Sequence, residues 1–354
     1  MTGSANTPLA LGDALSLASP PVPLDTALRV AREHYGIVGT ALRLTGERDQ
    51  NFLVQADGGQ GYLLKLSHPA EDRAFTDFQT QALLHIARAD PTLPVPQVIR
   101  ARDGRVELLL ALDDGPPRIV RLLSYLQGDL LPKAPRSSAQ RRHLAATLAR
   151  LALALQGFVH PAAAHDLLWD LKHAARLRPL LVHMPDGRRR ALAEQALADH
   201  AEHVEPHLRG LRSQVVHNDL NDYNVLVDPA NPDRVVGILD FGDMVHTALI
   251  NDLAIAASYQ LADSTDVLGA ALEFVAAYHA VLPLQPQEVD LLFDLMKMRL
   301  VTVVAISGWR AAQHPHNRDY ILRNNALSWA RLVRCSGLRR TQAQRLLRRA
   351  CHLE

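Results

Sequence analysis

Residues 214–243 decide the fold, and they read QVVHNDLNDYNVLVDPANPDRVVGILDFGD. An apolar run of strand character leads into His217-Asn218-Asp219, and a polar loop then carries the chain to Asn224 at the start of a second apolar run. A turn returns the chain to Val235–Leu239, which ends at Asp240-Phe241-Gly242. Because side chains at the ends of buried strands are rigid at their base and solvated at their tip, we expect these two carboxylates and the amide to converge.

Oxygen ligands of this kind suit a divalent metal, and phosphoryl transfer needs little beyond positioning and charge neutralisation. The spacing therefore predicts that Asp219 accepts the proton of an attacking hydroxyl and that Asn224 and Asp240 bind Mg²⁺. His-x-Asp, an Asn five residues after that Asp and Asp-Phe-Gly sixteen residues further on form the protein-kinase arrangement in compressed form. His217 is expected to orient the loop through its ring nitrogens.

The rest of the chain divides into a tail and two lobes. Residues 1–22 are rich in Ala, Ser, Thr and Pro without periodicity, which predicts a flexible tail. Residues 23–127 alternate short apolar runs with glycine-containing turns, and residues 128–354 are mostly of helical period. Five strands and one inserted helix over 71–89 are expected in the first lobe. Six runs have strand character, over residues 40–45, 51–57, 61–67, 97–100, 105–110 and 118–123. Further helices are expected over 24–34, 144–158, 166–181, 188–208, 250–261, 267–281, 287–312, 319–334 and 341–352.

Composition excludes several other classes of protein. The 38 basic and 37 acidic residues leave a net charge of +1, which argues against an extended nucleic-acid surface. Two cysteines in 354 residues form neither a disulfide framework nor a zinc motif. No signal-peptide pattern and no apolar run of membrane-spanning length is present, so we expect a cytoplasmic protein without a membrane partner.

The loop from His217 to Leu226 resembles the catalytic loop of aminoglycoside phosphotransferases and their choline-kinase and homoserine-kinase relatives, and the resemblance covers about residues 25–335. Residues 47–52, 169–171 and 242–254 are most similar to hydroxylysine kinase and its bacterial relatives. The resemblance implies a two-lobed, protein-kinase-like α+β fold, with a five-stranded antiparallel sheet and one helix in the first lobe and a mainly helical second lobe. It also implies ATP or GTP as phosphate donor.

The same resemblance implies roles in nucleotide binding. Lys65 on the third strand matches the lysine that binds the α- and β-phosphates. The turn over residues 46–51, with Arg48 and Asn51, matches a loop that closes over the phosphates, since no GxGxxG or Walker motif occurs. Ser124 and Leu126 lie in the segment that matches the hinge beside the base.

Two of these assignments leave alternatives open. Where the family has a glutamate that pairs with the strand lysine, this chain has Gln79. Asp77 or Glu71 is expected to pair with Lys65 if the helix is shifted, and otherwise a hydrogen bond to an amide is expected to orient the lysine. Asp252 matches an aspartate that supports the catalytic loop, but it is equally an ordinary acid near a helix N-terminus.

Acceptor binding is expected from polar residues within the apolar helices of the second lobe, chiefly Arg299, Arg310 and Asn325. Arg299 and Arg310 are three turns apart on one predicted helix and can share a face. Arginine binds a carboxylate through two parallel hydrogen bonds, which favours an amino-acid acceptor.

The sequence as a whole predicts a small-molecule kinase that transfers the γ-phosphate of ATP or GTP to a hydroxyl of an amino acid or amino alcohol. One alternative is an aminoglycoside phosphotransferase, which the lack of an acidic cluster in the last hundred residues disfavours. Another is a non-catalytic nucleotide-binding regulator, which the presence of all three catalytic side chains disfavours. A protein kinase is opposed by the absence of an Ala-Pro-Glu segment, and a homodimer is left open.

Overall fold

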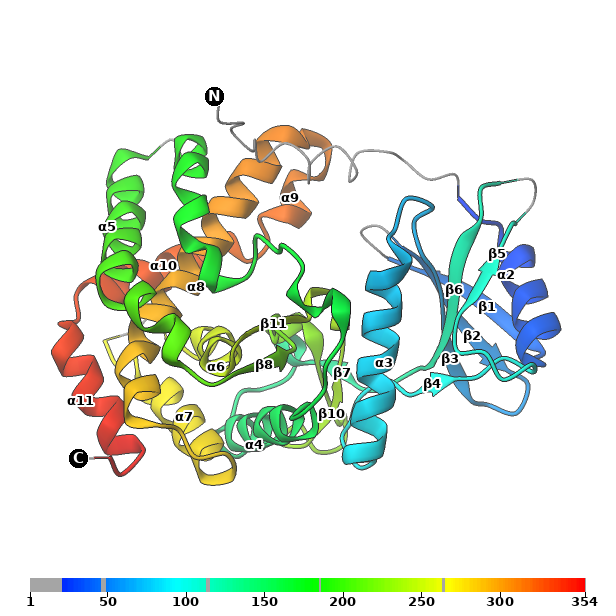
Figure 1. Ribbon diagram of the computed structural model, residues 1–354, viewed down its shortest axis with the longest axis horizontal. Helices are drawn as coiled ribbons and strands as arrows, with labels where there is room; N and C mark the ends of the chain where they lie inside the picture. Colours follow the sequence, from blue (N-terminus) through cyan, green and yellow to red (C-terminus); the bar gives the residue numbers. More distant parts are fainter. Residues whose placement is uncertain (1–20, 46–48, 113–114, 185, 263–264, 354) are drawn as a thin grey trace. The chain divides into compact units, whose positions relative to one another are not determined.

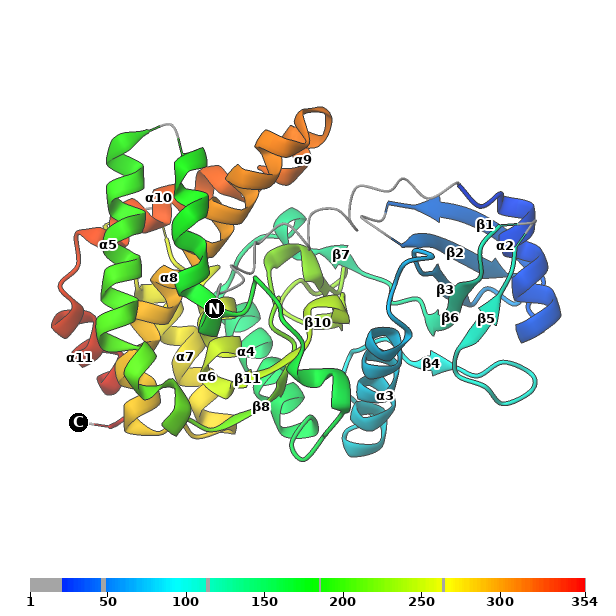
Figure 2. The same cartoon turned by 45° about the horizontal axis from the view of Figure 1, so that its top comes forward.

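The computed structural model describes residues 21–45, 49–112, 115–184, 186–262 and 265–353 (Figures 1 and 2). Contacts within the chain separate a first unit, Met1–Ala87 with Val95–Leu126, from a second unit, Arg88–Pro94 with Gln127–Glu354. The first unit is built on a sheet and the second is mainly helical, which confirms the predicted α+β class. The boundary at Leu126 falls one residue before the predicted one, and residues 88–94, predicted in the first lobe, group with the second unit.

An antiparallel sheet forms the body of the first unit. Its order is β1-β2-β3-β6, and β4 and β5 both pair with β6 along the edge that β3 leaves free. The sheet therefore has six strands, one for each of the six runs of strand character, and not the five that were expected for this lobe. Two short segments of two and three residues share that single edge. The strands are β1 (Gly39–Leu44), β2 (Gln50–Ala56), β3 (Gly61–Leu66), β4 (Val98–Ile99), β5 (Leu108–Leu110) and β6 (Arg118–Ser124).

One face of this sheet packs on the N-terminal helix. Alternate strand residues such as Phe52 and Leu64 are fully buried there, as the period of two along a strand requires. Helix α2 (Leu24–Val30) contributes to the same core and continues as one π-helical turn, η1 (Ala31–Tyr35). The turn stops at Gly36, whose φ of 75° is a conformation that glycine adopts at no steric cost.

The predicted flexible tail extends too far by at least one residue. Val22 is buried in the core beneath α2, and its N–H donates to Gln50 Oε1 at 2.6 Å. The first twenty residues of that predicted tail lie outside the described residues.

The opposite face of the sheet carries polar side chains. Asn51, Lys65 and Arg121 are cross-strand neighbours on this face. Helix α3 (Arg73–Ala89) adds Gln79, whose Oε1 accepts a hydrogen bond from Arg121 Nη2 at 3.1 Å. The sheet thus separates an apolar core from a face that holds charged groups.

Helix α8 (Pro286–Gln313) is the central element of the second unit and packs against α5, α6, α10 and α11 (Figures 1 and 2). Although α8 is long and largely apolar, it buries Lys297 and Arg299, and no helix in the described part of the chain is both long and apolar enough to cross a bilayer. The other α-helices of this unit are α4 (Ser138–Ala154), α5 (Gly187–His203), α6 (Leu249–Ser258), α7 (Gly269–Val281), α9 (Arg318–Ile321), α10 (Asn325–Ser336) and α11 (Arg340–Ala350). Short 3-10 helices lie at η2 (Leu131–Lys133), η3 (Pro161–Ala164), η4 (Leu171–His183), η5 (Glu205–Gly210), η6 (Asp222–Asn224), η7 (Phe241–Asp243) and η8 (Pro315–Asn317).

Two predicted helices of the second unit differ from the structure. The range 166–181 holds a 3-10 helix that begins only at Leu171 and is kinked at His173. Pro179 lies inside it and has no N–H to continue an α-helical ladder. The range 319–334 is divided into α9 and α10 by a turn over residues 322–324, where asparagine favours turns over helix interiors.

Two small antiparallel sheets position the loops of the second unit. β8 (Ser213–Val216) pairs with β11 (Val245–Ala248), while β9 (Val225–Val227) lies between β7 (Asp129–Leu130) and β10 (Val235–Ile238). Residues 217–224 connect β8 to β9, and residues 239–244 connect β10 to β11. Both polar loops therefore leave from the ends of paired strands.

His200 on α5 makes the stability of the second unit dependent on pH. It is 3% exposed, and burial lowers its pKa from 6.5 to about 4, an effect that Asp294 only partly opposes. His200 takes up a proton near pH 6.5 in the unfolded chain and only near pH 4 in the folded chain. The free energy of unfolding therefore decreases as pH falls through that window. We expect a loss of about 3 kcal/mol at most in the free energy of unfolding.

The variant His200→Leu is expected to flatten this dependence. Denaturant unfolding at pH 7 and pH 4.5 should show a smaller loss in His200→Leu than in the wild type, while His203→Leu, which changes a half-buried histidine on the same helix, serves as control. Equal losses in the wild type and His200→Leu would show that His200 does not carry the effect.

Candidate active site

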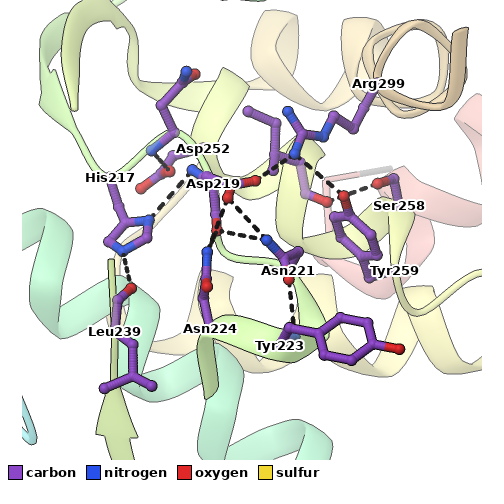
Figure 3. A network of polar contacts seen from close by, with 12 residues as sticks. His217, Asp219, Asn221, Tyr223, Asn224, Leu239, Asp252, Ser258, Tyr259 and Arg299 are labelled. Atoms are coloured by element: carbon purple, nitrogen blue, oxygen red, sulfur yellow. Dashed lines mark hydrogen bonds and ion pairs between the residues drawn. The ribbon is translucent and has the colours of Figure 1, made fainter. Parts of the chain in front are cut away.

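The loop that leaves β8 is anchored by His217, which is fully buried. Its Nδ1 accepts from the Asp219 N–H at 3.3 Å, and its Nε2 lies 2.9 Å from the Leu239 carbonyl oxygen (Figure 3). Because a backbone N–H can only donate and a carbonyl can only accept, the ring is neutral with its proton on Nε2. His217 thereby ties the loop after β8 to the end of β10.

Two residues at these strand ends have left-handed backbone conformations. Asn218 has a φ of 65° and Asp240 a φ of 59°. Asn and Asp are the side chains that tolerate this region best after glycine. The sharp turns at both positions redirect the chain at the point where its polar side chains emerge.

The carboxylate of Asp219 is held by three donors from two directions (Figure 3). Oδ2 accepts from Asn221 Nδ2 and from Asn224 Nδ2, each at 2.8 Å. Oδ1 accepts from Arg299 Nη2 at 2.5 Å. The Asp219 side chain remains 18% exposed, so its position is fixed while part of its surface stays accessible.

The amide of Asn224 has a defined orientation. Its Nδ2 donates both to the Asp219 carboxylate and to the Asp219 carbonyl oxygen, which leaves Oδ1 on the opposite side of the amide. The Asn224 carbonyl oxygen accepts from the Leu239 N–H at 2.8 Å, so Asp240 follows directly on the neighbouring strand. Oδ1 of Asn224 is therefore directed away from the base that its nitrogen holds.

Asp240 is exposed, and its Oδ1 accepts from the Gly242 N–H at 3.1 Å. The described residues contain no group of three His, Cys, Asp or Glu side chains that could hold a metal ion. Mg²⁺ usually keeps several water ligands and takes only one or two protein oxygens together with substrate phosphates. One amide oxygen and one exposed carboxylate therefore fit its requirements.

Asp252 supports the candidate catalytic loop through a hydrogen bond to the loop backbone. It lies in the first turn of α6, is 1% exposed, and its Oδ1 accepts from the Asn218 N–H at 2.8 Å. Burial raises the pKa of Asp252, and hydrogen bonds from the backbone N–H groups of Asn218 and His217 act in the opposite direction. Of the two interpretations that the sequence left open, this contact favours a supporting role over that of an ordinary helix-end acid.

Arg299 was predicted to bind the acceptor, but in the structure it contacts Asp219. It is 2% exposed on α8, bonds Asp219, and also donates to the Tyr259 hydroxyl at 3.2 Å. Its guanidinium carbon lies 5.3 Å from the Trp169 ring centroid. Burial alone would lower the pKa of Arg299, but Tyr259 and Asp219 outweigh that effect and raise it. Arg299 is thus the charged partner of the candidate base, and burial closes it to an incoming carboxylate.

The other two predicted acceptor residues are not drawn into this network. Asn325 begins α10 and donates to Ser307 Oγ at 2.8 Å. Arg310 is half-buried three turns beyond Arg299, and burial lowers its pKa. Neither contacts Asp219.

In the first unit, Lys65 pairs with an acid that the sequence did not indicate. Its Nζ lies 3.4 Å from Asp49 Oδ2. The expected partner Gln79 bonds Arg121 instead, because Arg121 stands opposite Lys65 on β6 and is nearer to α3. Asp77 bonds Gln81, one turn further along the same helix.

The remaining nucleotide-binding candidates also belong to the first unit. Asn51 is a cross-strand neighbour of Lys65, and its buried Oδ1 has no hydrogen-bond partner in the described part of the chain. Ser124 ends β6 and exchanges two hydrogen bonds with Gln97, at 2.8 and 2.9 Å. Leu126 is half-buried in a segment without regular structure. Arg48 lies outside the described residues.

Several residues of the site were not assigned from the sequence. Asn221 holds Asp219 but differs from any loop asparagine only by its position two residues after the base. Tyr259 follows the last turn of α6, forty residues from Asp219, and no sequence signal marks it. Asp49 lies within the predicted phosphate loop over residues 46–51, which is a signal that a search for the partner of Lys65 could have used.

Together, the sheet unit, the helical unit and the loop around Asp219 define a phosphotransferase of the kinase type. The chain belongs to the Phosphotransferase enzyme family, whose model matches residues 40–292, more than half of its length. It is 27% identical over 311 residues to hydroxylysine kinase of Mus musculus, with 82% of each chain covered. It is 30% identical over 255 residues to homoserine kinase of Methylobacillus flagellatus, with 69% of this chain and 71% of the relative covered. The chain is accordingly a small-molecule kinase that acts on a hydroxyl group.

Solved structures show the same fold. A microcompartment-associated aminopropanol kinase matches with a TM-score of 0.61 and 21% identity, over 93% of this chain and 99% of its own. The amicoumacin kinase hAmiN in complex with AMP-PNP, Ca²⁺ and Ami matches with a TM-score of 0.63 and 13% identity, over 86% of this chain and 93% of its own. The predicted kinase-like fold is confirmed by these likenesses, and the second of these proteins binds a nucleotide analogue together with a divalent cation.

Proposed function

We propose that this chain transfers the γ-phosphate of ATP or GTP to a hydroxyl of an amino acid of the hydroxylysine kind, with Asp219 as the base that receives the hydroxyl proton. The observation that carries the proposal is the fixed carboxylate of Asp219, held by Asn221 and Asn224 on one oxygen and by Arg299 on the other. The relatives named for hydroxylysine and homoserine support an amino acid as acceptor.

Phosphoryl transfer depends chiefly on the position of the Asp219 carboxylate. Phosphoryl transfer passes through a loose transition state in most analyses, so the acceptor hydroxyl gives up its proton late. A carboxylate held by Asn221, Asn224 and Arg299 is a well-oriented hydrogen-bond acceptor for that hydroxyl. His217 and Asp252 keep the loop in this geometry through its backbone N–H groups.

Asn224 Oδ1 and the Asp240 carboxylate would hold Mg²⁺. The metal supplies charge neutralisation to the phosphates when it is bound. The contribution of the chain is to present two oxygens at the ends of paired strands, one of them set by the bond between Asn224 Nδ2 and Asp219.

The first unit would bind the nucleotide. Lys65, which pairs with Asp49, would neutralise the α- and β-phosphates. Asn51, its cross-strand neighbour on β2, and Arg48 would also contact the phosphates. Ser124 and Leu126 would meet the base, and Leu126 suits this role because its backbone makes no hydrogen bond to other described residues.

The test is a phosphate-transfer screen with purified protein, Mg²⁺ and either ATP or GTP. Acceptors should cover hydroxy-amino acids, amino alcohols, sugars and aminoglycosides, with phosphorylated product detected by mass. We expect product from hydroxylysine or a close hydroxy-amino acid and none from sugars. Nucleotide hydrolysis without a preferred acceptor, or transfer only to aminoglycosides, would show that the proposed acceptor class is wrong.

A further inference from the structure

An arginine lies against two tyrosine rings beside the candidate catalytic loop. The guanidinium carbon of Arg323 lies 4.3 Å from the Tyr223 ring centroid and 4.6 Å from the Tyr320 ring centroid. Tyr223 belongs to η6 of the catalytic loop, Tyr320 to α9, and Arg323 to the turn between α9 and α10. The three residues all belong to the second unit.

The N–H donors of this guanidinium are available to a ligand. Two aromatic rings lie against the guanidinium, and its N–H groups make no hydrogen bond or ion pair within the described residues, although the Arg323 side chain is exposed. A guanidinium edge presents a planar fork of donors that matches a carboxylate. Because the rings already restrict the side chain, less rotational freedom is lost when a ligand binds.

Arg323 is connected to the candidate base through a short series of contacts. The Tyr223 N–H donates to Asn221 Oδ1 at 2.8 Å, and Asn221 Nδ2 donates to Asp219 Oδ2 at 2.8 Å (Figure 3). One aromatic ring and two hydrogen bonds therefore link the Arg323 guanidinium to the Asp219 carboxylate. A ligand with a hydroxyl at one end and a carboxylate a few bonds away has the chemistry to engage both.

The other arginines near the catalytic loop are already occupied. Arg299 is buried against Asp219. Arg136 lies 3.4 Å from Asp222 Oδ1 and donates to Gln260 Oε1 at 2.8 Å. Arg323 is the arginine at this loop whose donors are both exposed and without a partner among the described residues.

We propose that Arg323 binds the carboxylate of the acceptor and makes the kinase select hydroxy-amino acids over amino alcohols. This rests on the proposed function and deepens it, since both classes of acceptor carry the amine and the hydroxyl and only one carries the carboxylate. The acceptor hydroxyl would lie at Asp219 and the acceptor carboxylate at Arg323. The separation of hydroxyl and carboxylate within the acceptor therefore determines which hydroxyl is phosphorylated.

The test compares hydroxylysine with its decarboxylated amine in the wild type, Arg323→Met and Arg323→Lys. The wild type is expected to prefer the amino acid, and Arg323→Met to lower kcat/KM for hydroxylysine by about 10- to 100-fold, chiefly through KM. The values for the decarboxylated amine and the KM of the nucleotide should change less than about twofold. Arg323→Lys should fall between, because an ammonium keeps the charge and loses the fork. Arg318→Met is the matched control, since Arg318 is exposed and its side chain makes no hydrogen bond or ion pair within the described residues.

Three outcomes would overturn the assignment. An equal loss for both acceptors in Arg323→Met would mean that Arg323 only tethers α9 to the loop. A rise in nucleotide KM would place Arg323 with the donor phosphates. Equal use of both acceptors by the wild type would show that the enzyme does not recognise the carboxylate. If the wild type phosphorylates neither compound, the proposed function fails first, which separates that failure from those of Arg323.

Discussion

Asp219→Asn is expected to lower turnover by at least about 100-fold at saturating acceptor and nucleotide. The amide cannot accept the proton of the attacking hydroxyl, and it also ends the charged contact with Arg299 Nη2. The KM of the nucleotide should change little, because the nucleotide-binding candidates lie in the first unit. Steady-state kinetics of phosphate transfer measure this change.

The folding of this variant needs its own measurement. Arg299 is buried, and loss of its anionic partner leaves a charge without compensation, which in proteins costs about 3–5 kcal/mol. Thermal unfolding therefore sets the assay temperature, and Asp219→Glu serves as a variant that keeps the charge. Turnover in folded Asp219→Asn above about one hundredth of the wild type would remove Asp219 from the role of base.

Arg299→Met is expected to lower kcat by about 10- to 100-fold, with acceptor and nucleotide KM values within about twofold of the wild type. Methionine fills much of the same volume between Trp169 and Tyr259 but does not hold Asp219 Oδ1. The carboxylate then keeps only its two amide donors and samples orientations that do not face the acceptor. Kinetics with the acceptor found in the screen measure the effect.

Lys297→Met is the matched control for that substitution. Lys297 is also buried on α8, and its Nζ pairs with Asp199 at 2.7 Å and with Asp294 at 3.1 Å. We expect its loss to lower the free energy of unfolding while kcat of the folded protein stays near that of the wild type. If Lys297→Met and Arg299→Met lower kcat alike, the effect of Arg299 is one of general stability and not of the base.

The sequence could predict the geometry of the loop around Asp219 because the residues that build it are close together in the chain. Asp219, Asn221 and Asn224 lie within six residues, and the apolar runs on either side specify the strands that present them. The pairing of β9 with β10 then follows from a short turn, so Asp240 had to arrive beside Asn224. The order of elements in the two lobes followed from a change of hydrophobic period for the same reason.

Local sequence patterns could not predict the tertiary contacts. Arg299 meets Asp219 across 80 residues, and a buried arginine in an apolar helix reads equally as an acceptor ligand or a core ion pair. Arg323 lies in a turn that interrupts one predicted helix, so neither its exposure nor its tyrosine neighbours were visible. Lys65 was assigned a partner from helix register, whereas the nearest acid came from the turn before β2.

The orientation of the Asn224 amide explains why an amide and not a carboxylate stands at that position. Its nitrogen lies 2.8 Å from the Asp219 carboxylate, while its oxygen is on the opposite side of the amide, where it would face the proposed Mg²⁺. An aspartate there would be the stronger metal ligand in isolation, but two carboxylates at that separation repel each other, which raises the pKa of one of them. A proton on either carboxylate would deprive the metal or the acceptor hydroxyl of its partner. A neutral group with opposite polarity at its two ends lets one side chain serve two neighbours of unlike charge.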